Sequence, residues 1–328
     1  MEPQRSRSVE RSAPSYSVYG VGLTSAWPFT WPLVLSDVKS QLTFDFGSAV
    51  PQGLTPPSNE GGVAIEGEVA ADSPITIHPG EGYDVVRFRG LADHYLWSDR
   101  IYCHLRNEAM AHLVEIQLLG IVLALWLERH QVPTLHASVI VVNGRAVAFL
   151  GAPGRGKTTL ATALIAAGHE LLVDDLVATR IVGDQVLVQP GYPLLRLWPE
   201  QADHFVGDHT DFAKLHPTYD KRLVPIGRGF GTFCTEETPL ARIYLPARSR
   251  TDSEVSFVPV ASGEALLTLV ANSFLHEAVN RLGMAGPRLK ALSAVLSRTR
   301  LQVLRYPNGL DRLSDVIAAI EADVASDA

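Results

Sequence analysis

The chain has 328 residues, a length that suggests about two domains at roughly 100–200 residues each. Hydrophobic residues make up 46% and charged residues 19%, values that are ordinary for a globular protein and exclude a wholly disordered chain. The 28 Lys and Arg residues against 35 Asp and Glu residues give a net charge of −7. This balance argues against a nucleic-acid partner, because general nucleic-acid binders carry basic surfaces.

The number of cysteines and the length of the apolar runs indicate in which cellular compartment the protein is expected. Cys103 and Cys234 are too few cysteines for a disulfide framework, which fits a reducing cytosol. The first 15 residues lack the apolar core of a signal peptide, and the longest apolar run, residues 118–127, is shorter than the about 20 residues that span a bilayer. We therefore expect a cytoplasmic protein without a membrane partner.

The first half of the chain has the pattern of a small β-rich domain. We expect a loose tail over residues 1–15 and the β-rich domain over 16–105, where short β-type runs are separated by Gly and Pro. The expected strands are 16–24, 41–46, 63–69, 83–89 and 101–105. None of these runs carries a catalytic motif, so docking of an acceptor is our hypothesis for this domain.

Apolar residues recur at helical spacing over 107–130, and we expect a helix that connects two domains across 106–133. The second domain should span 134–328 and open with two strands around Asn143-Gly144, the dipeptide most typical of a tight β-hairpin. These strands are 134–142 and 145–150. After them we expect a Gly-rich loop, a helix at 157–167 that ends at Gly168, a strand at 170–174 and a second hairpin at Gly183-Asp184.

The segment 203–231 is polar and rich in His, Asp, Lys and Gly. A long structureless segment inside a compact domain is usually a functional lid or a solvated loop, and both interpretations stay open. The cations of a lid would be Lys214, Lys221, Arg222 and Arg228. The histidines of the segment, which are His204, His209 and His216, do not have the spacing of a standard zinc site. Strands at 241–246 and 254–259 and helices at 263–282, 287–298 and 310–324 complete the chain.

One motif matches the phosphate-binding pattern G-x-x-x-x-G-K-[ST] in full. Its glycines allow a tight turn in which backbone N–H groups point at phosphate oxygens, and the next helix adds its positive N-terminal end. Lys157 should reach the β- and γ-phosphates, and the Thr158 hydroxyl should bind Mg²⁺. The candidate nucleotide-binding residues are Gly151, Ala152, Pro153, Gly154, Arg155, Gly156, Lys157, Thr158 and Thr159, and the implied cofactors are ATP and Mg²⁺.

Two adjacent acids, Asp174 and Asp175, stand at the predicted end of a strand, 17 residues after Lys157. One is expected to hold the metal and the other to act as the base for an incoming hydroxyl. Side chains on an ideal strand alternate between faces, so both can serve only if the strand ends or bends there. Otherwise one acid faces the nucleotide and the other caps the next turn.

His136 is the third catalytic candidate. The Asn143-Gly144 hairpin pairs its strand with the strand of the phosphate loop, so the imidazole could approach the phosphates. A histidine in a strand is otherwise more often a core residue. Trp198 and Tyr192 are expected to be core or nucleotide-flanking residues and not catalytic ones, and the role of Arg196 stays undecided.

Three stretches together, Leu135-His136, GAPGRGKTT and Leu172-Val173-Asp174-Asp175, resemble the catalytic domain of HPr kinase/phosphorylase and the shorter HPr-kinase-like proteins, which include kinases of lasso-peptide precursors. The resemblance is strongest over 134–182 and extends from about residue 16 to the end for the HPr-kinase-like group. It implies a mixed α/β (α+β) fold, akin to phosphoenolpyruvate carboxykinase, in which a P-loop kinase domain follows the β-rich N-terminal domain.

The resemblance also implies roles for single residues. Asp174 would be the general base on a serine hydroxyl, and Asp175 and Thr158 would hold Mg²⁺. His136 would lie near the transferred phosphate, and Lys157 would hold the phosphates. Glu200 is a candidate for the family's additional metal-binding glutamate. The Arg-Gly signature of the bifunctional enzymes is replaced by residues 195–200, which argues against HPr as the acceptor and against a phosphorylase activity.

The expected function is therefore an ATP- and Mg²⁺-dependent serine kinase of a peptide, with a lasso-peptide precursor as the expected acceptor. The alternatives are a kinase of an HPr-type carrier protein or a small metabolite, and a non-catalytic nucleotide-sensing module. The paired acids argue against the sensor, because a sensor needs no base. A GTPase switch is not expected, because the sequence has no Asn-Lys-x-Asp motif. The oligomeric state stays open.

Overall fold

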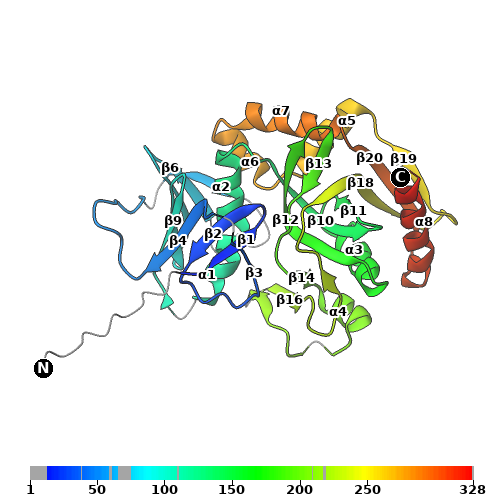
Figure 1. Ribbon diagram of the computed structural model, residues 1–328, viewed down its shortest axis with the longest axis horizontal. Coiled ribbons are helices and arrows are strands. Elements are labelled where there is room, and N and C mark those ends of the chain that lie inside the picture. Colours follow the sequence, from blue (N-terminus) through cyan, green and yellow to red (C-terminus); the bar gives the residue numbers. More distant parts are fainter. Residues whose placement is uncertain are drawn as a thin grey trace, which may run out of the picture.

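A computed structural model describes residues 13–37, 39–58, 61–65, 75–108, 111–208, 210–216 and 219–326 (Figure 1). The fold is mixed α/β, as expected from the sequence. One large sheet is built from the first third of the chain and another from the rest, with a helical run between them in the sequence. Most of the expected tail 1–15 lies outside the described residues.

Among the described residues, nine strands form the first sheet in the order β3-β1-β2-β4-β9-β8-β7-β6-β5. The expected strand 16–24 is two strands, because left-handed backbone at Tyr19 and Gly20 (φ 55° and 77°) reverses the chain. The bounds are β1 Ser15–Val18, β2 Val21–Ser25, β3 Val34–Leu35, β4 Leu42–Gly47, β5 Val63–Ile65, β6 Ile75–Pro79, β7 Asp84–Phe88, β8 Ala92–Leu96 and β9 Arg100–Leu105. The remainder of the expected strand 63–69 lies outside the described residues.

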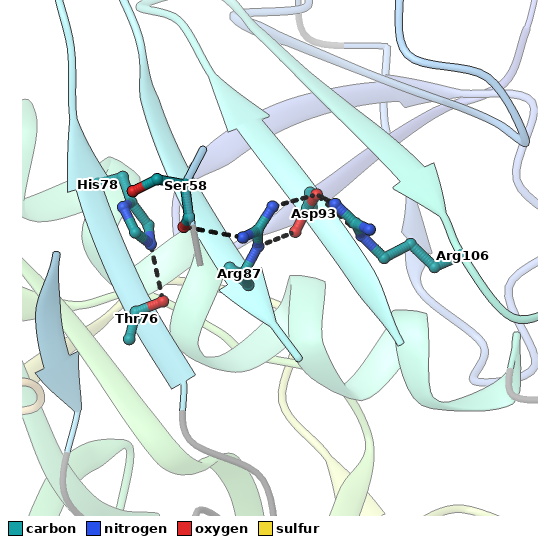
Figure 2. Close-up of polar contacts among 6 residues, drawn as sticks. All are labelled: Ser58, Thr76, His78, Arg87, Asp93 and Arg106. Carbon is teal, nitrogen blue, oxygen red and sulfur yellow. Dashed lines mark hydrogen bonds and ion pairs between the residues drawn. The ribbon is translucent and has the colours of Figure 1, made fainter. Parts of the chain in front are cut away.

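Strand β8 was not predicted, because it carries the buried polar residues Asp93 and His94. Figure 2 shows that Asp93 lies between two arginines, Arg87 of β7 and Arg106, which directly follows β9. Arg87 donates to both carboxylate oxygens at 2.9 and 3.2 Å, and the Nε of Arg106 donates at 3.0 Å. Burial alone would raise the pKa of Asp93, but hydrogen bonds from Arg87 and Arg106 lower it overall. The charge pairing makes a polar strand compatible with a buried position.

The connecting helix begins at residue 112, later than predicted. It consists of α1 His112–Gln117, a π-helical segment Leu118–Val122 and α2 Leu123–Arg129. The π-helical segment surrounds Gly120, whose backbone is non-helical. Glu115 accepts hydrogen bonds from two backbone N–H groups near residue 30, and Glu128 accepts from the N–H and hydroxyl of Thr134. The helix therefore fastens the first sheet to the start of the second.

The second sheet carries the phosphate loop. Its bounds are β10 Thr134–Val142, β11 Arg145–Leu150, β12 Glu170–Val182, β13 Gln185–Val188, β17 Thr232–Phe233, β18 Thr238–Ser249, β19 Ser256–Pro259 and β20 Arg300–Pro307. Both predicted hairpins are confirmed, with Val142 opposite Arg145 and Val182 opposite Gln185. Strand β11 pairs with β10 on one side and runs parallel to β18 on the other. The predicted helix after the loop is α3 Lys157–Ala166, followed by Gly168.

The segment 203–231 is not a long loop, so this prediction is wrong. It contains the end of α4 Pro199–Phe205 and two strands, β15 Lys214–His216 and β16 Tyr219–Pro225, which join β14 Leu194–Leu197 in a small sheet. Leu223 and Val224 are buried, and the backbone of β16 pairs with β14. This short apolar run inside a polar segment decides the local structure.

The C-terminal part differs from the prediction in two places. The predicted helix 263–282 is two helices, because the carbonyl of Thr134 accepts from the N–H of Phe274 and Leu275 has a φ of 54°. Strand β20 lies between two helices in the sequence and was missed. The helical elements are α5 Ser262–Ala271, α6 His276–Arg281, α7 Ala285–Leu296, a 3₁₀ turn Leu310–Arg312 and α8 Leu313–Ala325. Within the described ranges, every helix is too short or too polar to cross a membrane.

Candidate functional site

The loop 151–156 joins the buried strand β11 to the first turn of α3. Gly151, Gly154 and Gly156 have φ values of 137°, 79° and 97°, which L side chains rarely adopt. The motif therefore has its glycines where the backbone requires them. Ala152, Pro153 and Arg155 are exposed between them. The loop curves in front of the N-terminus of α3, whose free N–H groups and dipole attract anions.

Lys157 is the first residue of α3, and only 8% of its surface is exposed. Its Nζ donates a hydrogen bond to the carbonyl oxygen of Gly151. The side chain thus turns back across the loop, and its charge lies at the loop itself. A cation in this position is suited to the phosphates of a nucleotide.

The two threonines after Lys157 have different surroundings. Thr158 is half-buried in the first turn of α3, and its carbonyl accepts from the Thr162 hydroxyl at 2.6 Å. The hydroxyl of Thr159 accepts a hydrogen bond from the Gln201 amide at 2.6 Å, which fastens α3 to α4. Gln201 was not singled out in the sequence, because it lies 42 residues away.

Asp174 and Asp175 lie inside β12, not at its end, so this part of the prediction is wrong. The strand continues because residues 176–178 are buried and pair with residues 134–136 of β10. Asp175 has a φ of 78°, an uncommon backbone conformation for a residue other than glycine, which bends the strand between its two acids. The bend lets both carboxylates enter one network of contacts.

Each acid has its own partners. One oxygen of Asp174 accepts from the Ser138 hydroxyl at 2.6 Å, and the other accepts from the backbone N–H of Arg196 at 3.3 Å. Asp175 forms an ion pair with the guanidinium of Arg196, and its other oxygen is 3.1 Å from Nδ1 of His136. Asp175 thus does not act as a simple turn cap.

Arg196, on β14, is the residue that holds both acids, and the sequence had left its role undecided. Its side chain is 13% exposed and also donates to the Tyr192 hydroxyl at 3.1 Å. Burial lowers the pKa of Arg196, while the nearby Asp174 charge opposes that shift. The signal in the sequence for a functional Arg196 was that it is the single arginine in the apolar stretch 191–198.

His136 lies at the edge of the same network, with 41% of its side chain exposed. Partial removal of the ring from water and the positive charge of Lys157 lower the pKa of His136, and Asp174 opposes this. The ring is therefore neutral at pH 7. Strand β10 brings the loop and the acids together, because Ala137 pairs with Leu150, the residue before the loop, on one side and with Asp175 on the other.

Of the cations in 203–231, Lys221 also contributes to the lowered pKa of His136, and its Nζ lies 5.3 Å above the Trp198 ring. Lys214 instead pairs with Asp220 at 2.7 Å. His209 lies outside the described residues. In the parts of the chain that the structure describes, no three His, Cys, Asp or Glu side chains form a metal-binding group.

Comparisons with known proteins give partial matches. The chain is 32% identical to an HPr kinase/phosphorylase of Exiguobacterium sp. over 92 residues, which are 28% of this chain and 29% of that protein's length. No family model matches. The solved HPr(Ser) kinase/phosphatase of Coxiella burnetii aligns with 59% of this chain and 95% of its own, at 14% identity and a TM-score of 0.30. A TM-score of this size carries no argument about the fold.

The donor set at the acids fits a hard divalent cation. Asp175 would supply a carboxylate and Thr158 a hydroxyl, and Mg²⁺ binds proteins through one or two carboxylates together with substrate phosphates and water. In the structure, the guanidinium of Arg196 takes the place of a cation beside Asp175. The site thus combines an anion-binding loop, a lysine, a neutral imidazole and two carboxylates.

Proposed function

We propose that the protein is an ATP- and Mg²⁺-dependent kinase that transfers the γ-phosphate to a serine hydroxyl of a peptide, with a lasso-peptide precursor as the acceptor. The observation that carries the proposal is the register of β10, in which Ala137 pairs with Leu150 at the start of the loop on one side and with Asp175 on the other. The partial similarity to an HPr kinase/phosphorylase supports phosphoryl transfer as the reaction class.

Phosphoryl transfer requires alignment and charge neutralisation more than covalent chemistry by the protein. Asp174 takes the proton of the serine hydroxyl as its oxygen attacks the γ-phosphorus, and the bond from that phosphorus to the β-phosphate oxygen breaks to release ADP. Lys157 and the loop N–H groups stabilise the negative charge of the phosphates. Asp175 and Thr158 would hold Mg²⁺, which would supply further positive charge at the transferring group.

Ser138 has a defined part in this mechanism. Its hydroxyl donates to one oxygen of Asp174 and holds the carboxylate in place. The second oxygen is held only by a longer bond of 3.3 Å from a backbone N–H. This second oxygen is the better acceptor for a substrate proton, since its present bond is the weaker one.

The test is transfer to defined acceptors. The full chain is incubated with Mg-ATP and separately with a serine-containing precursor peptide, an HPr-type carrier protein and small hydroxyl metabolites, and the mass gain of one phosphate is measured. Phosphorylation of the peptide at serine supports the proposal. Transfer only to the carrier or to a metabolite contradicts the peptide assignment.

A second candidate is a module that binds ATP without spending it. The observation in its favour is that each acid already has a partner, Ser138 for Asp174 and Arg196 for Asp175. A sensor binds ATP but forms no ADP with any acceptor. ADP formation that depends on an added acceptor excludes it.

A further inference from the structure

A cavity of about 580 Å³ opens at the tip of the phosphate loop, away from the acids. Part of its wall is the loop, with Pro153, Gly154 and Arg155. The rest is Arg248 and Ser249 at the end of β18, Arg250 directly after it, and Asn308 directly after β20. The carbonyl of Ser249 accepts from the N–H of Asn308 at 2.8 Å, which joins these two strand ends. We call this space the loop-tip cavity.

The sheet places the loop-tip cavity and the acids on opposite sides of the loop. Strand β11, which leads into the loop, has β10 and then β12 with Asp174 on one side. On its other side it pairs with β18, which ends near Arg248. A triphosphate in the loop therefore has one flank that carries carboxylates and another that carries arginines.

The cavity is rich in planar cations. Arg155, Arg248 and Arg250 all line it, and none of the described residues that line it is acidic. Arg248 donates to the Gly154 carbonyl at 2.7 Å and so is fixed against the loop. Guanidinium planes stack on nucleic-acid bases, and an asparagine side chain can both donate to and accept from a base or ribose.

From this arrangement we infer that the loop-tip cavity binds the base and ribose of the nucleotide. The inference rests on the proposed function. When the γ-phosphate of ATP points at Asp174, the base and ribose of the same molecule lie on the other side of the loop. The volume is in the range of about 300–1,000 Å³ that is typical of small-ligand pockets. Arg248 and Arg155 flank the entrance, and Arg250 and Asn308 contact the nucleoside.

The experiment compares ATP, ADP and inorganic triphosphate as probes, with calorimetry on the full chain. Arg250→Ala and Asn308→Ala should each weaken ATP and ADP binding at least fivefold and leave triphosphate binding within twofold. Arg250→Lys should bind ATP as weakly as Arg250→Ala does, because an ammonium does not stack on a base as a guanidinium does. The matched control is Arg305→Ala, whose side chain pairs with Asp252 and does not line the cavity.

Equal losses for ATP and triphosphate, with rescue by Arg250→Lys, would mean that the cavity binds phosphate, and would overturn the inference. Unchanged ATP affinity in both variants would overturn it as well. Failure of the wild-type chain to bind any of the probes would instead overturn the proposed function, and the nucleoside site with it. Thermal denaturation of each variant checks that the fold is intact.

Discussion

Arg196 and Asp175 form an ion pair in which both side chains are largely buried, at 13% and 17% exposed. The arginine comes from the small sheet β14–β16 and the acid from the bend in β12. This pair fastens the small sheet to the strand that carries the acids. It also balances a negative charge that Mg²⁺ would otherwise balance.

Replacement of this arginine should therefore destabilise the protein and expose Asp175, the proposed Mg²⁺ ligand. Arg196→Gln should lower the free energy of unfolding by about 3 kcal/mol, because a buried carboxylate loses its cation. Added Mg²⁺ should restore part of that loss in the variant and less in the wild type. Chemical denaturation with and without Mg²⁺ measures both effects.

The control for this variant is Arg180→Gln, which breaks the more exposed pair between Arg180 and Glu237. An exposed pair contributes about 0–1 kcal/mol, so the change should be small and independent of Mg²⁺. Equal destabilisation by the two variants would contradict a special role for Arg196.

Lys157→Ala should weaken the binding of both ATP and inorganic triphosphate by about 10- to 100-fold, as expected from the loss of a charged hydrogen-bond donor to phosphate. Calorimetry measures the two affinities. Lys290→Ala, on the exposed surface of α7, serves as the control and should change neither. An unchanged affinity in Lys157→Ala would refute the assignment of the loop.

His94 should make folding sensitive to acid. The ring is fully buried, and neither nitrogen has a hydrogen-bond partner among the described residues. Burial lowers the pKa of His94 from 6.5 to about 3. Below pH 6.5 the ring is therefore protonated in the unfolded chain and stays neutral in the folded chain. The free energy of unfolding that comes from the neutral His94 ring is present above pH 6.5 and is lost as the pH falls.

At about 1.4 kcal/mol per pH unit, His94 should remove about 2 kcal/mol of stability between pH 6.5 and 5. His94→Leu should flatten the dependence by that amount, and the exposed variant His276→Gln should not. Urea denaturation at both pH values measures the difference. Parallel curves for the wild type and His94→Leu would show that the ring titrates normally.

Local signals in the sequence predicted the parts of the site that depend on neighbouring residues. The hairpin at Asn143-Gly144, the glycines of the loop and the helix after it follow from backbone preferences over a few residues. The sequence showed only that the strand must end or bend if both acids are to serve. It did not predict the bend at Asp175, because an aspartate with a left-handed backbone has no distinct sequence pattern.

Contacts between distant residues could not be predicted in the same way. Ser138 is 36 residues from Asp174, and Arg196 is 21 residues from Asp175. The position of Arg196 depends on β16, which forms within a segment whose polar composition predicted a loop. Strand β8 was not predicted because Asp93 and His94 are buried in it, and hydrophobic periodicity does not show that two arginines pair with Asp93 in the folded protein.

The most direct measurement of the central claim is single-turnover phosphate transfer by Asp174→Asn, together with its ATP affinity. We predict an affinity within about twofold of the wild type and a transfer rate lower by about 10²- to 10⁴-fold, because the carboxylate accepts the hydroxyl proton. Asp184→Asn, in the exposed turn of the β12–β13 hairpin, should transfer phosphate at the wild-type rate. Transfer at that same rate by Asp174→Asn would contradict the account.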